Sequence, residues 1–390
     1  MLCLATSEAE PSGDLNSSLL PRVAAALALL FVFLIGVKGL GSGFRLLGEE
    51  LTRGFFAATE NPFVGLVVGL LATTIVQSSS VTTAMVVAMV AAPENPLPLA
   101  NAIPMVMGAN IGTTVTATVV SLAHLGRQDE FKRAFPIAIC HDIFNYFSVL
   151  LLLPVEMATG YLRRTAIWLA GQLGGVSGVE YESPVDVALQ VGLSPLVAFA
   201  DIAFAAQVPR TVFLITASGL CIFFALFLLV KVMRAALHTR VERAVNNVLG
   251  RSAFVSIVIG TMITVMVQSS SITTSILVPL GGAGLLKLEQ AFPVTIGANI
   301  GTTVTALLAA MAVSGPNAAV GLEVALVHLL FNMSGFVIIY PIRAIRKIPL
   351  AVARGVTQLA LRSRKLTVLG IALLFYGLPG LCIAIAGWFS

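Results

Sequence analysis

Long apolar runs separated by short charged connections dominate the chain, and this pattern predicts an all-α protein that crosses a membrane many times. About 20 apolar residues are needed to span the hydrocarbon core of a bilayer as a helix. Runs of this kind are expected at 21–40, 62–92, 100–125, 134–153, 211–230, 252–282, 293–313, 319–342 and 366–388. Only 11% of the 390 residues are charged, whereas a soluble domain carries roughly 25%.

Two polar elements interrupt these runs, and each occurs twice. Gln-Ser-Ser-Ser-Val-Thr-Thr at 77–83 has a near copy, Gln-Ser-Ser-Ser-Ile-Thr-Thr, at 268–274. Gly-Ala-Asn-Ile-Gly-Thr-Thr-Val-Thr-Ala at 108–117 recurs unchanged at 297–306. Amides and hydroxyls are costly in hydrocarbon unless they find partners. We therefore expect a helical hairpin at each first element and a broken helix at each second element, together forming a binding site made by internal duplication.

The basic loops predict the orientation of the chain. Lys and Arg gather at 126–133, 231–251 and 343–365, and the positive-inside rule places these stretches in the cytoplasm. The acidic middle loop at 155–210, with short amphipathic pieces, and the connection at 314–318 should then be external.

The loop at 126–133 and the connection at 314–318 hold equivalent places in the two halves, yet they are expected on opposite sides. Two repeats of inverted topology follow, as in secondary transporters. The predicted organisation is an N-terminal cytoplasmic segment, a first membrane repeat, the external middle loop, a second inverted repeat, and a basic cytoplasmic stretch with the last helix. These units cover residues 1–20, 21–154, 155–210, 211–342 and 343–390.

Charge and cysteine content exclude several classes of protein. The net charge of +5 comes from loops that membrane topology requires, so nucleic acid is not an expected partner. The four cysteines share no metal-binding or disulfide spacing. There is no Gly-x-x-x-x-Gly-Lys-Ser/Thr loop for ATP and no arrangement that indicates hydrolysis. We expect neither an enzyme nor a cofactor, and the first 20 residues do not resemble a cleaved signal peptide.

The repeated motifs contain no Lys, Arg, Asp or Glu. An anion between them must be held by hydroxyls, amides, backbone N–H groups at half-helix N-termini and co-bound cations. Ser, Thr, Asn and Gln oxygens suit Na⁺, which would offset the charge of the anion. The motifs thus favour a cation-coupled anion symporter. The alternative is that small residues only let the helices pack closely.

Ionisable residues inside the apolar runs are further candidates. His141 and His328 recur in both halves, and their role is equally compatible with structure or function. Asp142 has no acidic counterpart, because Leu329 takes its place, and it is either a cation ligand or half of an internal ion pair. Asn145 and Asn332 are duplicated and are expected to line or brace the site.

At these motifs the chain resembles the type II sodium-dependent phosphate cotransporters, specifically their bacterial members. The resemblance rests on both Gln-Ser-Ser-Ser segments, both Gly-Ala-Asn-Ile-Gly-Thr-Thr segments, Asp-Glu-Phe-Lys-Arg-Ala-Phe at 129–135, the His-Asp and His-containing helices, and Ala-Gly-Trp at 386–388. It implies Na⁺-coupled uptake of inorganic phosphate, with the two hairpins facing each other and an elevator-like movement of the repeats. Arg127 stands where electrogenic animal members are expected to carry Asp, which leaves the number of coupled Na⁺ ions open.

By motif position, the resemblance implies a site to which both Gln-Ser-Ser segments contribute and which Asn110, Thr113, Asn299 and Thr302 complete. The division of the residues between phosphate and Na⁺ is our own inference. The phosphate ligands are expected to be Gln77, Ser78, Ser79, Asn110, Gln268, Ser269, Ser270 and Asn299. The Na⁺ ligands are expected to be Ser80, Thr83, Thr113, Asp142, Asn145, Ser271, Thr274, Thr302 and Asn332.

The expected location is the plasma (inner) membrane, as a multi-pass protein with a cytoplasmic N-terminus and a homodimer as one option for its assembly. Two other functions remain open at this point. The cargo is another small oxyanion or a carboxylate in the first, and the protein is a membrane sensor without transport in the second. The second is disfavoured because the chain shows no soluble signalling domain.

Overall fold

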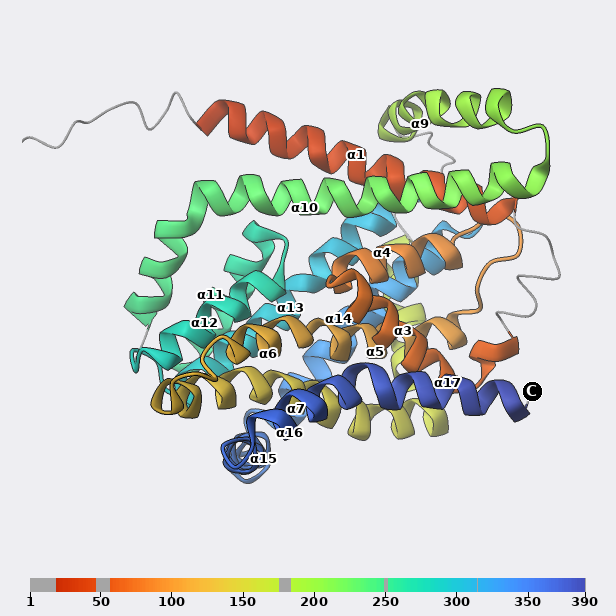
Figure 1. Cartoon of the computed structure of the whole chain (residues 1–390). Helices are drawn as coiled ribbons and strands as arrows, with labels where there is room; N and C mark the ends of the chain where they lie inside the picture. Colours follow the sequence, from red (N-terminus) through yellow and green to blue (C-terminus); the bar gives the residue numbers. More distant parts are fainter. Residues whose placement is uncertain (1–18, 47–56, 175–183, 249–251, 314, 390) are drawn as a thin grey trace, which may run out of the picture.

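The computed structural model describes residues 19–46, 57–174, 184–248, 252–313 and 315–389, and every element labelled in them is helical (Figure 1). The elements are Leu19–Arg45 (α1), Pro62–Val76 (α3), Ser79–Val90 (α4), Leu99–Thr113 (α5), Val115–Leu122 (α6), Gln128–Thr159 (α7), Tyr161–Gly174 (α8), Pro184–Ala203 (α9), Gln207–Val248 (α10), Ala253–Val267 (α11), Ser270–Gly282 (α12), Leu288–Met311 (α13), Ala318–Ile339 (α14), Arg343–Ala360 (α15), Arg364–Ala372 (α16), the π-helical turn Leu373–Gly377 (η1) and Leu378–Phe389 (α17). Within these ranges, six helical segments are long and apolar enough to cross a membrane. The prediction of an all-α polytopic membrane protein is confirmed.

Each Gln-Ser-Ser-Ser element forms the predicted helical hairpin. Gln77 ends α3 with a φ of 59°, and Gln268 ends α11 with a φ of 55°. This left-handed conformation stops a helix, because it turns the next peptide away from the helix axis. Ser78 and Ser269 are then extended, with φ of −152° and −154°, and begin α4 and α12 as N-caps. The two turns are therefore near copies of each other in conformation as well as in sequence.

Glycines bring the first arm of each hairpin into backbone contact with the helix that carries the Asn motif. A Cβ atom at Gly69 or Gly108 would collide with backbone of α5 or α3, and a Cβ atom at Gly260 or Gly297 would collide with backbone of α13 or α11. The α3–α5 and α11–α13 pairs are consequently built in the same way. Close approach of this kind is how membrane helices gain packing contacts in the absence of a hydrophobic driving force.

The second arm of each hairpin packs against the opposite half of the chain. In the first half α4 contacts α13 and α14, and in the second half α12 contacts α6 and α7. Ala91 lies beside Gly321 at one of these contacts, and Gly282 lies beside Ala134 at the other. The two halves thus exchange equivalent contacts and enclose the polar motifs between them.

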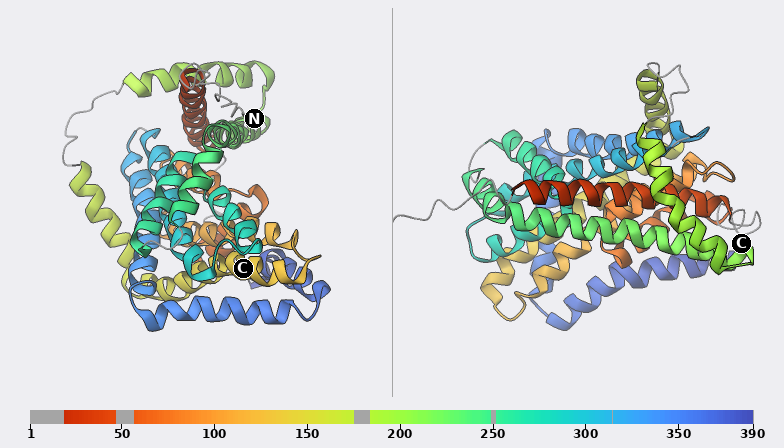
Figure 2. Two further views of the ribbon diagram at one scale, coloured as in Figure 1. Left: turned by 90° about the vertical axis from the view of Figure 1, so that its left-hand side faces the viewer. Right: turned by 90° about the horizontal axis from the view of Figure 1, so that it is seen from above.

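Helices α1 and α10 pack along each other and form a layer beside this core (Figures 1 and 2). Gly36, Gly39 and Gly43 of α1 face Ile222, Ser218 and Ile215 of α10 at close range. Phe33 and Val37 pack in one buried cluster with Val81 and Ala84 of α4, which connects the layer to the first hairpin.

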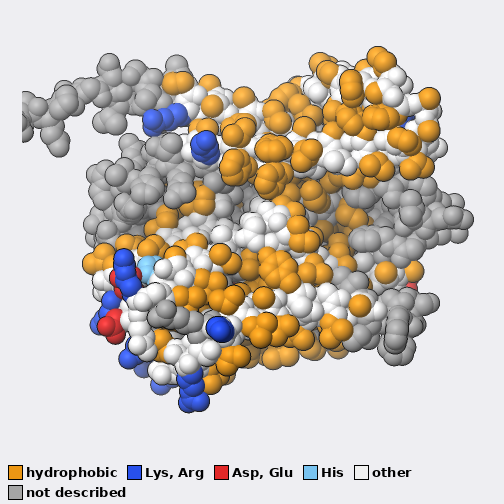
Figure 3. Space-filling view, in the orientation of Figure 1, with side chains coloured by type: hydrophobic (Ala, Val, Ile, Leu, Met, Phe, Trp, Pro, Cys, Tyr) orange, Lys and Arg blue, Asp and Glu red, His pale blue; other side chains and the backbone are white. Residues whose placement is uncertain are grey.

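Large hydrophobic side chains are exposed over much of the surface, as a lipid-facing protein requires (Figure 3). Ile75, Met311 and Phe254 are 72%, 76% and 71% exposed. Lys and Arg gather toward one end of the view in Figure 3, around the α6–α7 connection and α15. A charged end and an apolar band agree with a membrane-spanning protein.

The expected broken helix at the second Asn motif is wrong. Helix α13 runs from Leu288 to Met311 without a break, and α5 is separated from α6 only at Thr114, whose backbone remains right-handed helical. Thr302 and Thr303 donate to the carbonyls of Ala298 and Ile300 of their own helix. The threonine hydroxyls therefore donate to carbonyls of their own helix, and the glycines allow close packing of α13 on α11. Neither kind of residue unwinds α13.

The expected loop at 155–210 is wrong in part, because most of its described residues are helical. Pro154 does not end α7, which continues to Thr159 and stops where Gly160 adopts a φ of 62°. A membrane-embedded proline is tolerated when neighbouring groups satisfy the freed carbonyl. Helices α8 and α9 follow, and they span 14 and 20 residues.

Several charged loops are shorter than predicted. Helix α7 begins at Gln128, inside the expected loop at 126–133, and α10 continues through the basic stretch to Val248. The stretch at 343–365 contains the amphipathic helix α15. The predicted N-terminal cytoplasmic segment before residue 19, the connection at 47–56 and residues 175–183 of the expected middle loop lie outside the described residues.

Candidate functional site

The carboxamides of Gln77 and Gln268 hold the two hairpin turns in equivalent ways. Each Nε2 donates to a carbonyl in the last turn of the preceding helix, that of Thr74 or of Val265. Each Oε1 accepts from a threonine of the Asn motif in the same half. Thr116 Oγ1 lies 3.0 Å from Gln77 Oε1, and Thr305 Oγ1 lies 2.8 Å from Gln268 Oε1.

The hairpin turns leave two helix N-termini inside the structure. The Oγ of Ser78 accepts from the backbone N–H of Val81, and the Oγ of Ser269 accepts from that of Ile272. Other N–H groups of the first turns have no intrahelical acceptor, because a helix always leaves its first donors unpaired. These N-termini carry partial positive charge and attract anions. The turns thus supply anion-binding donors without a charged side chain.

Ser80 connects the hairpin turn of the first half to the Asn motif of the second half. Its Oγ lies 3.4 Å from Thr305 Oγ1, and Thr305 in turn donates to Gln268. No equivalent hydrogen bond from Ser271 is found within the described part of the chain. Gln77 is exposed, whereas Gln268 is half-buried. The two copies therefore differ in their surroundings even though their local conformations agree.

The asparagines of the second motif form a crossed network with the His helices of the opposite halves. His141 Nε2 lies 2.7 Å from Asn299 Oδ1, and Asn299 Nδ2 donates to Asn145 Oδ1 at 2.7 Å. In the reciprocal arrangement, His328 Nε2 and Asn332 Nδ2 lie 3.3 and 3.1 Å from Asn110 Oδ1.

One further bond links the two halves of this network, since Asn145 Nδ2 donates to the backbone carbonyl of Asn110 at 3.0 Å. All six side chains are at most 4% exposed. His141 Nδ1, His328 Nδ1 and Asn332 Oδ1 are buried without a hydrogen-bond partner in the described residues, so the network is only partly satisfied. The bonds that it does make join helices of both halves, and breaking any of them would leave a further buried polar group unpaired.

Asp142 lies on α7 next to His141 and is 2% exposed. Its Oδ2 accepts from Thr118 Oγ1 of α6 at 2.8 Å, and its Oδ1 has no hydrogen-bond partner in the described residues. No ion pair with Asp142 occurs in those residues either, so the alternative of an internal ion pair is not observed. A buried carboxylate without a counter-charge is strongly unfavourable, and this geometry leaves an oxygen available to a cation.

The structure brings together some of the residues expected at the site and separates others. Asn110, Asn145, Asn299 and Asn332 share the crossed network, and the Gln and Ser residues flank the hairpin turns. Thr113, Thr274 and Thr302 donate to carbonyls of their own helices. Thr83 is fully buried, and its hydroxyl lacks a partner among the described atoms. The assignment of individual ligands to phosphate or Na⁺ stays a prediction.

Sequence reasoning missed Thr116, Thr305 and Thr118 as members of the site. The first two hold the glutamine carboxamides, and the third bonds Asp142. A signal was present for Thr116 and Thr305, since both belong to the repeated Thr-Thr-Val-Thr stretch. Thr118 lies just beyond the repeat, and only the packing of α6 on α7 identifies it.

Comparisons with known proteins agree with these features. The family described as Na+/Pi-cotransporter matches residues 32–167 and 221–382. The sodium-dependent phosphate transport protein 2A of Rattus norvegicus is 32% identical over 438 residues, which cover 94% of this chain and 68% of the relative. The sodium-dependent phosphate transport protein 2B of Homo sapiens is 30% identical over 457 residues, which cover 94% and 66%.

No solved structure gives a significant match. The two matched segments contain both hairpin turns, both Asn motifs and both His helices. The match therefore includes every element of the site described above. On these grounds, the chain belongs to the Na⁺/Pi-cotransporter family.

Proposed function

We propose that the protein is a symporter that couples inward Na⁺ movement to the uptake of inorganic phosphate. The observation that carries this proposal is the pair of hairpin turns. Each turn is followed by a helix N-terminus with unpaired N–H groups, and it lies beside an Asn motif that contains no charged side chain. Relatives named as sodium-dependent phosphate transport proteins support the choice of ions. The protein is a multi-pass membrane transporter in this proposal, and it needs no cofactor and performs no catalysis.

Phosphate binds between the two turns in this proposal. The N-terminal N–H groups of α4 and α12, the hydroxyls of Ser78, Ser79, Ser269 and Ser270, and the amides of Gln77 and Gln268 supply the donors. Phosphate oxygens accept several hydrogen bonds at once, and helix N-termini suit them without an Arg or Lys. Asn110 and Asn299 are proposed to complete the phosphate site, and the crossed network holds their side chains in place.

Na⁺ compensates the charges that the site leaves unpaired. Asp142 offers a free carboxylate oxygen beside Thr118, and Thr83 offers an unpartnered buried hydroxyl. Ser80 and Ser271 at the hairpins, with Thr113, Thr274, Thr302, Asn145 and Asn332, supply further oxygens. Cations bound close to phosphate lower the electrostatic cost of moving it through a low-dielectric interior.

Alternating access is proposed to follow from two repeats of inverted topology. The reciprocal contacts of α4 with α13 and of α12 with α6 support a pseudo-twofold relation between the halves. We assign α1 and α10 to a scaffold against which the hairpins move in an elevator-like manner. In this proposal the N-terminus is cytoplasmic, on the basis of loop charge. The membrane is proposed to be the plasma (inner) membrane of a bacterial cell, on the basis of the resemblance to bacterial members of the family.

The decisive experiment is uptake of labelled phosphate into proteoliposomes that contain the full chain. An inward Na⁺ gradient should drive accumulation, and replacement of Na⁺ by choline should abolish it. Equal uptake in choline would overturn the Na⁺ coupling. Unlabelled sulfate, a small dicarboxylate and phosphate are then compared as competitors at the same concentration. Stronger inhibition of uptake by sulfate or the dicarboxylate than by phosphate would identify another anion as the cargo.

A further inference from the structure

Helix α15 has a chemical character that the transport site does not use. Pro349, Leu350, Ala353, Thr357 and Ala360 are buried against the core. The rest of the helix carries four cations, which are Arg343, Arg346, Lys347 and Arg354. Figure 2 shows α15 along its full length in the view in which α1 and α10 are seen nearly end-on. An amphipathic helix that lies across the membrane-spanning helices is the arrangement expected at a membrane interface.

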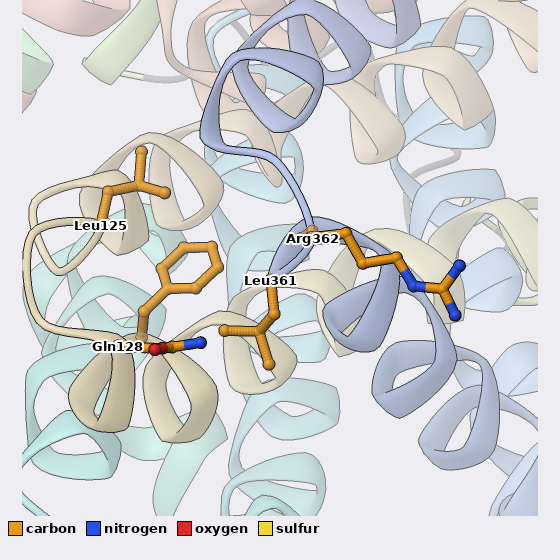
Figure 4. Close-up of a pocket in the computed structure, with 6 residues that line it drawn as sticks. Leu125, Gln128, Leu361 and Arg362 are labelled. Atoms are coloured by element: carbon orange, nitrogen blue, oxygen red, sulfur yellow. The ribbon is translucent and has the colours of Figure 1, made fainter.

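Three cavities lie along α15. The smallest, about 260 Å³, is lined by Leu125, Gln128 and Leu361, and the guanidinium of Arg362 extends away from it (Figure 4). The second, about 470 Å³, has Arg346, Lys347 and Arg354 on its wall, and Arg346 lies 4.9 Å from the centre of the Tyr340 ring. The third is the most basic.

The third cavity, about 450 Å³, lies between the start of α7, the α12–α13 connection and α15. Its cations are Lys132, Arg133, Lys287 and Arg354, and its one carboxylate is Glu289. Glu289 pairs with Arg354, and Arg133 Nε donates to the carbonyl of Gly282 at 3.0 Å. Lys132 and Lys287 are exposed and have no carboxylate partner in the part of the chain that the structure describes.

The surroundings of this cavity are apolar as well as basic. Pro136, Leu286 and Leu288 line it, and Leu285 beside it is 61% exposed. A free anion gains nothing from an exposed apolar side chain such as Leu285 beside the cavity, whereas a lipid can place an acyl chain against it. Basic pockets at the ends of membrane helices recognise anionic headgroups in this way.

We propose that the third cavity binds the headgroup phosphate of an anionic phospholipid, with Lys132 and Lys287 as its main cationic contacts. The lipid would tie α15 to α7 and to the α12–α13 connection, which belong to different halves of the chain. This inference depends on the membrane location of the protein and not on the identity of the transported anion.

The test is a lipid titration of the purified full chain in neutral detergent, with bound lipid counted by native mass spectrometry. Phosphatidylglycerol should bind to the wild type, and phosphatidylcholine with the same acyl chains should bind far more weakly. Lys132→Gln with Lys287→Gln should weaken phosphatidylglycerol binding by about 30-fold, the factor expected from two cations at headgroup level. The matched control, Arg163→Gln with Arg164→Gln on α8, removes the same charge elsewhere and should bind as the wild type does.

Equal binding of the two lipids would overturn the proposal, as would unchanged binding by the lysine double variant. A second arm adds inorganic phosphate as competitor. If free phosphate displaces phosphatidylglycerol from this cavity at matched concentrations, the cavity is a site for the free anion and the lipid assignment is wrong. The thermal unfolding midpoint of each variant, measured in the absence of lipid, shows that the fold is intact.

Discussion

Gln77 and Gln268 occupy a backbone conformation that glycine would adopt at lower cost. Together with Asn95 they are the non-glycine residues of positive φ within the described chain. A left-handed conformation costs a residue with a Cβ about 1–2 kcal/mol. Each side chain offsets this cost by donating to the preceding helix and accepting from a threonine of the Asn motif. Strain retained at a turn that closes a polar site is a reason to expect function there.

Gln77→Gly and Gln77→Ala distinguish the contribution of the left-handed backbone from that of the carboxamide side chain. Both variants remove the amide, but only glycine relieves the turn, so Gln77→Gly should be about 1 kcal/mol more stable than Gln77→Ala. Both should lose at least about tenfold in Na⁺-dependent phosphate uptake, the loss expected for one hydrogen bond to a charged ligand. Gln268 should behave in the same way. Gln128→Ala and Gln128→Gly, at the exposed start of α7, serve as controls.

Uptake in proteoliposomes and thermal unfolding in detergent measure the two effects independently. Wild-type uptake by Gln77→Gly would show that the protein needs only the turn and not the carboxamide. The phosphate-binding role of the Gln77 carboxamide would then be wrong, and the backbone N–H groups and serine hydroxyls of the turn would remain as the donors.

At the scale of elements, the helix pairs α3–α5 and α11–α13 depend on glycine at their points of contact. A Cβ atom at Gly108 would overlap the carbonyl oxygen of Leu66, and a Cβ atom at Gly297 would overlap that of Ile257. The next glycine of each Asn motif would place its Cβ atom 2.6 or 2.7 Å from a carbonyl oxygen of the same partner helix. The same spacing of glycines therefore holds both pairs together.

Gly108→Ala and Gly297→Ala should each destabilise the protein by about 1–3 kcal/mol, because the added methyl group forces two helix backbones apart. Gly171→Ala on α8 is the matched control, since a Cβ atom there meets nothing within 4 Å. This control should be neutral or more stable by about 0.5–1 kcal/mol, as expected for alanine in place of glycine in a helix. Thermal unfolding in detergent measures all three. Unchanged stability of Gly108→Ala would show that the helices are not held at backbone contact.

The sequence predicts the elements better than the contacts between them. The hairpin turn at Gln77 is predictable, because a polar cluster in the middle of an apolar run cannot continue as a lipid-facing helix. The break expected in α13 is wrong. Glycine and threonine, as at Gly301 and Thr302, occur both where a helix unwinds and where it packs closely, so the sequence does not distinguish the two. The bond between His141 and Asn299 joins residues that are 158 positions apart, and no local pattern specifies it.

At the scale of the whole molecule, the layer of α1 and α10 meets the core through a limited set of contacts. The two helices pack mainly on each other (Figure 1). They reach the first hairpin through α4, and they also contact α11 and α13 of the second half. A Cβ atom at Gly219 of α10 would lie 3.3 Å from Cε of Met85 of α4. Inside the core, by contrast, the hairpins are held by the reciprocal contacts of the two halves. The proposed elevator-like movement would have to take place at the interface between this layer and the core.

Cross-linking tests this division. Cysteines at Met85 and Gly219, joined by a short bifunctional thiol reagent, should stop phosphate uptake, because the link ties α4 to α10. Cysteines at Ala91 and Gly321 should leave uptake intact when oxidised, because a Cβ atom at Gly321 lies 3.4 Å from Cβ of Ala91 within the core. Both pairs are introduced after Cys3, Cys221 and Cys382 are replaced by serine. Mass spectrometry measures the extent of linkage, and a cleavable reagent allows uptake to be restored by reduction.

Two results would contradict the assignment of α1 and α10 as a scaffold. Wild-type uptake by the protein linked between Met85→Cys and Gly219→Cys would mean that α4 does not move along α10. Loss of uptake on oxidation of the Ala91→Cys and Gly321→Cys pair would place the movement inside the core, between the first hairpin and α14. The boundary between moving and static parts would then run through the crossed network, and Asn110 with His328 would have to separate during each cycle.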